Sequence, residues 1–221
     1  MYSKFGQFID GKWSPSTDKG TYEVINPATE EVLGHASKAT PADVDKALKS
    51  AEKGLAVWKK ITPWERSYIL RRVADKLREK KDVLAKWMTL ENGKPLAEGV
   101  GETNGAADIF EWNAEETKRI FGQTIESRFE DTRVHVYYQP VGVVAALSPW
   151  NFPLILAARK ISTALAAGCS VIIKPDTITP GVVMELVDIC RECGVPPGAV
   201  NLLSGDPPSI DSQLIQSDII K

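Results

Sequence analysis

The stretch Ser148-Pro149-Trp150-Asn151-Phe152-Pro153 contains the first side chain whose type and setting could do chemistry. Two prolines restrict the backbone on either side of Asn151. An asparagine held in this way can donate its side-chain NH₂ to a developing oxyanion, which requires a donor that is aimed before the charge forms. The alternative is that Asn151 only satisfies the backbone of a turn, a common role of asparagine. The local sequence leaves both interpretations open.

A lysine-proline pair, Lys174-Pro175, follows a second apolar run. It places a cation where the ribose or phosphate of a dinucleotide would pass. The alternative is an exposed loop lysine with no particular role. Neither G-x-G-x-x-G nor G-x-x-x-x-G-K-[ST] occurs, so the usual fingerprints do not support nucleotide binding.

Cys190 and Cys193 have the spacing of a redox or zinc motif. Both are predicted at the end of a helix, where the negative end of the helix dipole raises the pKa of a thiol. One such pair with two distant histidines cannot supply four good zinc ligands. No metal site is therefore predicted, and no G-x-S-x-G or H-E-x-x-H motif is present.

These candidate residues follow strands of a predicted parallel sheet. Two short, continuous apolar runs are typical of strands that are buried on both faces. The predicted elements are strand 142–147, helix 154–167, strand 171–173, helix 181–193 and strand 200–203. This βαβαβ order indicates half of a doubly wound sheet, whose ligands lie beyond the carboxyl ends of the strands. A short helix over 209–216 leads to residues 218–221, which look like the start of a fourth strand, so we expect the chain to be a piece of something longer.

The amino-terminal part is predicted to combine β-structure and helices. Asp10-Gly11 between apolar runs predicts a tight hairpin, followed by strands near 22–25 and 32. Thr40 and Thr62 each precede a proline and begin helices, and the helical pattern extends to about residue 120. The basic face of the second helix is interpreted as a solvated surface, because acidic residues are interspersed on it. Alternation around 134–138 predicts a strand that is either a sheet edge or an arm that pairs with another subunit.

The bulk composition excludes several classes of protein. The 221 residues carry 27 Lys and Arg against 29 Asp and Glu, a net charge of -2 that does not suit a nucleic-acid partner. Three cysteines and an amino terminus without an apolar core predict a reducing cytoplasm. Val136 to Ala158 is uncharged, but three prolines interrupt it, so no membrane span is expected.

Three motifs together closely resemble the NAD(P)-dependent aldehyde dehydrogenase superfamily: Pro149-Trp150-Asn151-Phe152-Pro153, Ala164-Leu165-Ala166-Ala167-Gly168-Cys169 and Lys174-Pro175. Supporting matches are Phe8-Ile9-Asp10-Gly11-Lys12-Trp13, Asn26-Pro27-Ala28-Thr29, Glu91-Asn92-Gly93-Lys94-Pro95 and Gln139-Pro140-Val141-Gly142-Val143-Val144. The resemblance covers essentially all 221 residues, but only the amino-terminal portion of a family member. The helices look nearest to the succinate-semialdehyde dehydrogenase branch.

The resemblance implies an α/β fold with an incomplete Rossmann-type doubly wound sheet, an amino-terminal helical and hairpin segment, and an oligomerisation arm. Residues 1–126 would begin the cofactor-binding domain, 127–140 would form the arm, and 141–221 would be the first half of the NAD(P)-binding sheet. The alternating segment is then an arm rather than a plain edge. The complete protein would be a homodimer or homotetramer that oxidises a small-molecule aldehyde.

The resemblance also implies roles for individual residues. Asn151 would be the oxyanion-hole amide that stabilises the thiohemiacetal formed when a cysteine thiolate attacks the aldehyde. Lys160 would lie near the catalytic centre, and Lys174 would contact the adenine ribose. The segment from Leu147 through Ser148 and Pro149 to Trp150 would line the cofactor, NAD or NADP, together with Gly205.

Two departures from the family pattern bear on the cofactor. Thr177 stands where NAD-preferring members often have a glutamate, so no carboxylate repels a 2′-phosphate, and NADP is expected to be tolerated. Pro207 replaces a second common glycine of the loop that contains Gly205, which puts the cofactor role of Gly205 in doubt.

The catalytic centre of the family is incomplete in this chain. The nucleophile motif Gly-Gln-x-Cys and the general-base motif Glu-Leu-Gly-Gly are absent, and Gly122-Gln123 is followed by Thr124-Ile125. The chain alone is therefore expected not to oxidise aldehydes. The alternatives are a short, non-catalytic paralogue that binds nucleotide or caps a full-length subunit, and a flavodoxin-like module, which the loop from Ser148 to Pro153 does not suit.

Overall fold

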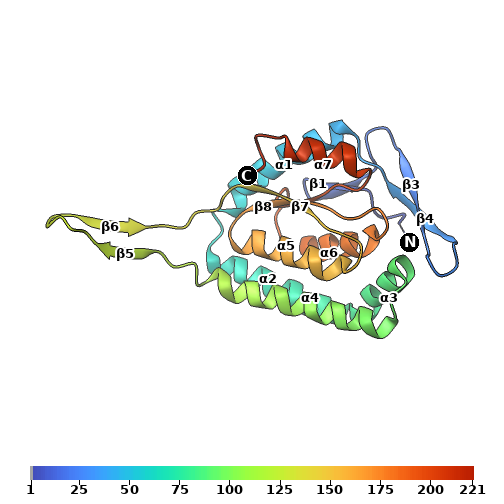
Figure 1. The fold of residues 1–221 in the computed structure, drawn as a ribbon, viewed down its shortest axis with the longest axis horizontal. Coiled ribbons are helices and arrows are strands. Elements are labelled where there is room, and N and C mark those ends of the chain that lie inside the picture. Colours follow the sequence, from blue (N-terminus) through green and yellow to red (C-terminus); the bar gives the residue numbers. More distant parts are fainter. Residues whose placement is uncertain (1) are drawn as a thin grey trace.

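The computed structural model describes residues 2–221 and contains a five-stranded mixed sheet with helices on both faces (Figure 1). In spatial order the strands are β2 (Lys12–Ser14), β1 (Gln7–Ile9), β9 (Val200–Leu202), β8 (Ser170–Lys174) and β7 (Val143–Leu147). The last three are parallel, as predicted. β1 pairs antiparallel with β9 through Phe8 and Leu202, so the amino-terminal hairpin extends the same sheet, which the sequence did not predict.

The parallel strands follow the order of one half of a doubly wound sheet. The connections β7 to β8 and β8 to β9 run through α5 (Pro153–Ala166) and α6 (Pro180–Glu192), within a few residues of the predicted ranges. After α7 (Pro207–Ile215), Ile220 makes a parallel bridge with Val143 on the other side of β7. The strand order therefore reverses at β7, where such folds place their ligands.

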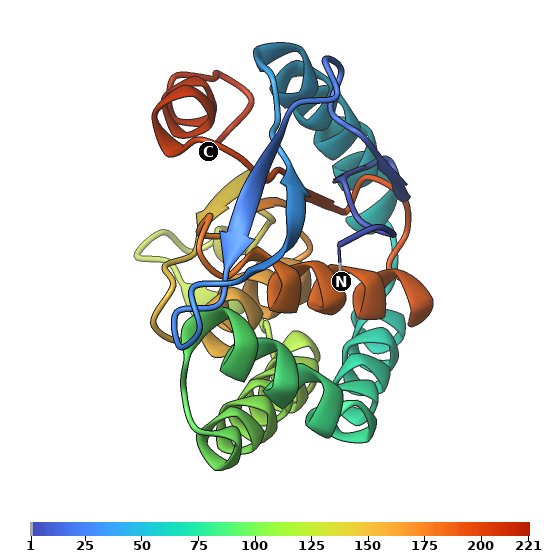
Figure 2. The same ribbon diagram turned by 90° about the vertical axis from the view of Figure 1, so that its right-hand side faces the viewer.

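The helices form layers above and below the sheet (Figures 1 and 2). α1 (Pro41–Trp58) and α7 pack on one face, while α5 and α6 pack on the other. A further layer lies outside α5 and α6 and consists of α2 (Pro63–Glu79), α3 (Lys81–Asn92) and α4 (Leu96–Thr117). Two buried apolar clusters, one on each face of the sheet, hold these layers together.

Local sequence signals account for the starts of the first two helices. Thr40 and Thr62 are the N-cap residues of α1 and α2, and each forms a complete capping box with the acidic residue three positions on. The amino-terminal hairpin turns at Asp10 and Gly11, whose φ angles of 53° and 77° are those of the tight turn predicted for an Asp-Gly pair.

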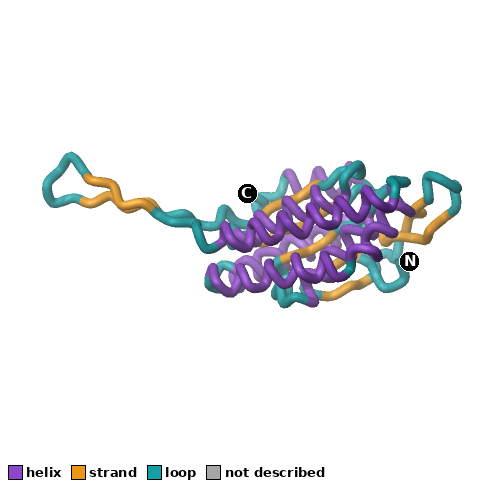
Figure 3. The backbone as a smooth tube through the Cα atoms, turned by 90° about the horizontal axis from the view of Figure 1, so that it is seen from below, coloured by secondary structure: helices purple, strands orange, loops and turns teal. Residues whose placement is uncertain are grey.

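Two smaller antiparallel hairpins complete the described structure. β3 (Thr21–Ile25) pairs with β4 (Val32–Ser37) beside the main sheet. β5 (Gln123–Glu126) pairs with β6 (Arg133–Val136) in a hairpin that projects away from the helices (Figure 3). The predicted alternating strand is thus one half of a projecting hairpin that begins at Gln123, ahead of the expected boundary at 127.

The uncharged stretch 136–158 is divided between the end of β6, the whole of β7 and the first part of α5. Across residues 2–221, no helix combines the length and the apolar character needed to cross a membrane.

Candidate functional site at the carboxyl end of the parallel strands

The loop that contains Asn151 begins at the carboxyl end of β7, at the point where the strand order reverses. Leu147 and Lys174, the last residues of β7 and β8, are partners in the sheet. The Ser148 backbone N–H donates to the Lys174 carbonyl at 3.0 Å, which continues the ladder for one residue. The predicted residues Leu147 to Trp150 and Lys174 are therefore neighbours along one edge of the sheet.

Two side chains at the junction of α3 and α4 donate hydrogen bonds to the backbone of this loop. The Asn92 side chain donates to the Trp150 carbonyl at 3.0 Å, and the Lys94 ammonium donates to the Asn151 carbonyl at 3.2 Å. No role was predicted for Asn92 or Lys94 from the sequence. Their presence in the Glu91-Asn92-Gly93-Lys94-Pro95 motif was the only signal that could have singled them out.

The side chains of the loop point partly to solvent. Trp150 and Phe152 are about half exposed, and Asn151 is exposed. Within residues 2–221 the Asn151 side chain forms no hydrogen bond to turn backbone, so the structure does not favour the alternative that it only satisfies a turn. An exposed amide on a backbone held at two carbonyls can meet a ligand directly.

Lys174 is buried, with 5% of its surface exposed. The alternative of an exposed loop lysine is therefore wrong. Its charge acts on Asp211 of α7: burial raises the pKa of that carboxyl, and the positive charge of Lys174 partly opposes the rise. Asp211, which sequence reasoning missed, brings a carboxylate close to the lysine expected to contact a ribose.

Gly205 and Thr177 lie in the loops that follow β9 and β8. Gly205 has a φ of 144°, and a Cβ there would lie 2.9 Å from the Ala39 backbone nitrogen, so packing against the β4–α1 turn is sufficient reason for a glycine. Thr177 is partly exposed and lines a shallow groove with residues of β3, including Tyr22 and Ile25. Cofactor contact by either residue stays a prediction.

Lys160 lies apart from the other predicted residues. It is in the second half of α5 and lines an apolar groove between α5 and β7 with Val144, Thr163 and Cys169. The described lining of this groove includes neither Asn151 nor Lys174. The Ser148 hydroxyl is buried without a hydrogen-bond partner in residues 2–221.

Carboxylates occupy the amino-terminal ends of both crossover helices. Glu102 of α4 accepts hydrogen bonds from the Leu154 and Ile155 amides at the start of α5, and Glu91 of α3 accepts from Gly181 at the start of α6. Helix amino termini are common phosphate sites, but here they are already filled. Contact of Lys174, Thr177 and Trp150 with a nucleotide stays a prediction.

Glu91 makes stability depend on pH. Its side chain is fully buried, and burial raises its pKa to about 7, although hydrogen bonds from Tyr2, Gly181 and Val182 favour the charged form. In the unfolded chain the group titrates near 4.5. Between these two pKa values the folded protein keeps a proton that the unfolded chain releases. The contribution of protonated Glu91 to the free energy of unfolding is therefore complete below pH 4.5 and is lost as the pH rises to about 7.

We expect Glu91→Gln to remove this dependence, because glutamine does not titrate. The free energy of unfolding of the wild-type chain should fall, relative to the variant, by up to about 3 kcal/mol between those two pH values. Urea unfolding across the range measures it. Glu130→Gln, at an exposed carboxylate in the hairpin, should leave the slope unchanged; the prediction is wrong if Glu91→Gln also leaves it unchanged.

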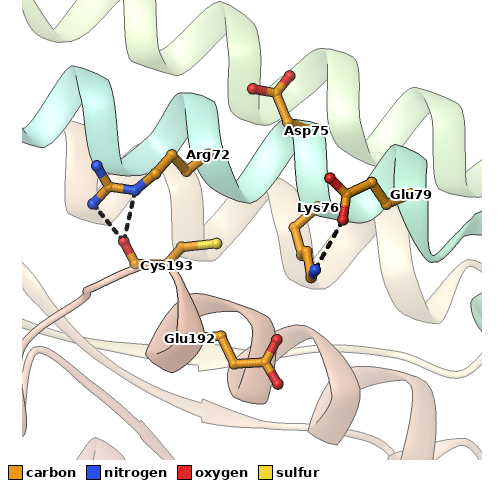
Figure 4. Close-up of a pocket in the computed structure, with 6 residues that line it drawn as sticks. All are labelled: Arg72, Asp75, Lys76, Glu79, Glu192 and Cys193. Carbon is orange, nitrogen blue, oxygen red and sulfur yellow. Dashed lines mark hydrogen bonds and ion pairs between the residues drawn. The ribbon is translucent and has the colours of Figure 1, made fainter.

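The Cys-x-x-Cys pair and the basic face of α2 have structural explanations. The pKa of both Cys190 and Cys193 is raised, as predicted, and burial is the largest cause. Arg72 donates to the Cys193 carbonyl at 3.1 and 2.6 Å, and Lys76 pairs with Glu79 (Figure 4). Arg71 and Arg78 pair with carboxylates of α4, so the basic side chains of α2 have partners within the chain. The part of the chain that the structure describes contains no cluster of three or more metal-ligating side chains.

Comparisons with known proteins identify relatives of this arrangement. Residues 13–221 match the sequence model of the aldehyde dehydrogenase family. A glutarate-semialdehyde dehydrogenase of Pseudomonas putida is 41% identical over 97% of this chain, and a succinate-semialdehyde dehydrogenase [NADP(+)] of Escherichia coli is 39% identical over 96%. The crystal structure of succinate-semialdehyde dehydrogenase from Burkholderia pseudomallei superposes on 98% of the chain with a TM-score of 0.96 and 39% identity.

The chain spans less than half the length of these relatives. It covers 45% of the Pseudomonas putida protein, 44% of the Escherichia coli protein and 45% of the Burkholderia pseudomallei chain.

Proposed function

Because this chain belongs to the aldehyde dehydrogenase family, we propose that the complete protein oxidises an aldehyde to a carboxylic acid with NAD or NADP. The observation that carries this proposal is the position of Asn151. It is an exposed amide on a loop whose backbone is held at two carbonyls, at the reversal of strand order in a parallel sheet. Fixed donors at such a position stabilise an oxyanion without reorganisation.

The substrate class that we propose is a small semialdehyde. The relatives named for glutarate and succinate semialdehydes support it, since they are about 40% identical over nearly the whole chain.

We also propose a homodimer or homotetramer, with the projecting β5–β6 hairpin as the oligomerisation arm. The unpaired, buried cysteines are typical of a reducing compartment, which supports a cytoplasmic location.

The residues of this chain divide the work of such a reaction. Asn151 donates its side-chain N–H to the oxygen that becomes negative when a nucleophile adds to the aldehyde carbon. Lys174 and Thr177 hold the nucleoside part of the cofactor, with Trp150 and the backbone from Leu147 to Pro149 beside it. The nicotinamide supplies the hydride acceptor. We propose that Lys160 lies near the catalytic centre, and the family resemblance is the basis for this assignment.

We propose that these 221 residues do not oxidise aldehydes by themselves. Cys169, Cys190 and Cys193 are all buried, with exposed fractions of 2%, 0% and 8%. Burial raises the pKa of Cys190 and Cys193, which disfavours the thiolate that a nucleophile requires. The second candidate function is that of a short paralogue that binds nucleotide or caps a full-length subunit.

Reading the coding DNA past Lys221 tests the proposal first. A continuing frame that encodes Gly-Gln-x-Cys should yield a protein that forms NADH or NADPH, measured by absorbance, when supplied with succinate or glutarate semialdehyde. A stop codon directly after Lys221, with nucleotide binding by the 221-residue chain, would favour the paralogue. Absence of turnover by a complete protein with every tested semialdehyde would contradict the oxidation.

Thr177 should set the tolerance for NADP. Thr177→Glu in the complete protein is expected to lower kcat/KM with NADP by at least about 10-fold and to change kcat/KM with NAD little, because the new carboxylate repels the 2′-phosphate. Steady-state kinetics with both cofactors measure this. Thr177→Gln, which adds similar bulk without charge, is the control. A wild-type enzyme that already uses NAD almost exclusively would contradict the expectation.

A further inference from the structure

A buried ion pair between Lys94 and Glu102 contacts the backbone of the Asn151 loop. Lys94 and Glu102 are 8% and 6% exposed, and their ammonium and carboxylate groups are in contact. Removing two charges from water costs free energy that their mutual attraction often fails to recover, so a buried pair is weak evidence for stability. The contacts that the two groups make outside the pair are therefore the better guide to their role.

Lys94 acts on the loop at Asn151 and at the next residue. Its ammonium donates to the Asn151 carbonyl at 3.2 Å and lies 4.6 Å from the centre of the Phe152 ring. The hydrogen bond restricts rotation of the peptide plane that follows Asn151. The cation also attracts the face of the aromatic ring, which favours this orientation of the half-exposed Phe152 side chain.

Glu102 acts on the helix that follows the loop. One carboxylate oxygen accepts from the Leu154 and Ile155 amides at 2.9 and 3.1 Å, and the other contacts Lys94. The N-cap residue of α5, Phe152, offers no side-chain cap. The carboxylate of a distant helix thus takes the place of a capping side chain, and its charge is favourable at the positive end of the helix.

The pair therefore holds the chain at Asn151 itself and at the start of α5, while Asn92 holds the Trp150 carbonyl. We propose that the Lys94–Glu102 pair positions Asn151, so that the amide is aimed before substrate binds. This inference rests on the proposed oxidation, because aiming matters only where charge develops. Lys94 and Glu102 are positioning residues, which act through Asn151.

The test replaces both charges at once in the complete protein. Lys94→Met with Glu102→Met keeps the bulk of both side chains and leaves no unpaired buried charge, so folding should survive. We expect kcat with a semialdehyde to fall by about 10- to 100-fold, since small misplacements of a reacting group have effects of this size. The dissociation constant of NADP, measured by fluorescence titration, should change less than about 2-fold.

Three further variants keep the test decisive. Lys94→Arg should retain most of the wild-type kcat, because a guanidinium can still pair with Glu102 and reach the Asn151 carbonyl. Lys76→Met with Glu79→Gln, an exposed pair on α2, is the matched control and should change nothing. If the double methionine variant does not fold, Lys94→Met with Glu102→Gln takes its place, with the same expected loss of kcat.

The outcomes separate this inference from the proposed function. A kcat within about 2-fold of wild type in the charge-free variants would overturn it, as would a loss that appears in cofactor affinity instead of kcat. An inactive wild-type protein would contradict the oxidation. The structural part of the inference, that the pair holds the start of α5, would then be judged separately on hydrogen exchange at Leu154 and Ile155 in the 221-residue chain. Faster exchange in the double methionine variant supports the hold on the start of α5, and unchanged exchange overturns it.

Discussion

Asn151→Ala in the complete protein should lower kcat by about 100- to 1,000-fold, the usual effect of removing one oxyanion donor. The physical reason is that the loop has no second side-chain amide. Phe152 has no side-chain donor, and the Ser148 hydroxyl is buried. Single-turnover and steady-state kinetics with a semialdehyde would measure the loss.

The KM for the cofactor should stay within a few-fold, because Asn151 is expected to act on the reacting oxygen. Asn151→Asp should be at least as damaging as alanine, since a carboxylate repels the developing negative charge. Asn104→Ala, at an exposed asparagine on α4, is the matched control and should have wild-type kinetics. A kcat for Asn151→Ala within 10-fold of wild type would remove Asn151 from the proposed mechanism.

Gly54→Ala should destabilise the chain by about 3 kcal/mol or more, at or above the upper end of the usual range for overpacking. Gly54 lies in α1, where the helix meets the turn before β9. A Cβ there would lie 2.0 Å from the Gly198 carbonyl carbon and 2.3 Å from the Ala199 nitrogen. Both are backbone atoms, so no side chain can rotate away, and α1 would have to move off the sheet.

Gly101→Ala provides the opposite expectation within the same chain. Gly101 lies in α4, is exposed, and has nothing within 4 Å of an added Cβ. Alanine should therefore stabilise the chain by about 0.5 to 1 kcal/mol through the lower backbone entropy of the unfolded state. Chemical denaturation of both variants tests the pair. Equal effects of the two substitutions would show that α1 does not pack against the turn at Gly198 as described.

Much of the local structure followed from short-range signals. Asp10-Gly11 predicted the hairpin turn, and Thr40 and Thr62 predicted two helix starts, because each of these features depends on contacts within four residues. Apolar runs predicted the three parallel strands and the crossover helices between them. The family resemblance rested on the same stretches and was confirmed by the match over residues 13–221.

Contacts between distant segments could not be predicted from local sequence patterns. Nothing local to Phe8 predicts its pairing with Leu202, which joins the amino-terminal hairpin to the parallel sheet. The burial of Lys174 was missed for the same reason, since its environment is formed by elements that lie elsewhere in the chain. Glu91 and Glu102 look like ordinary helix residues in sequence, yet each caps a helix that begins at least 50 positions later.

Local sequence patterns are enough to identify the residue types at the candidate site and the order of strands and helices that delivers Asn151 to the end of β7. These depend on periodicity and turn chemistry, which act over a few residues. The way in which the Asn151 loop is held depends instead on contacts between distant segments. The Lys94–Glu102 pair, the bond from Asn92 to Trp150 and the filled helix amino termini exist only because packing brings the α3–α4 corner against α5 and α6. Such long-range contacts depend on the folded backbone, and no local pattern encodes them.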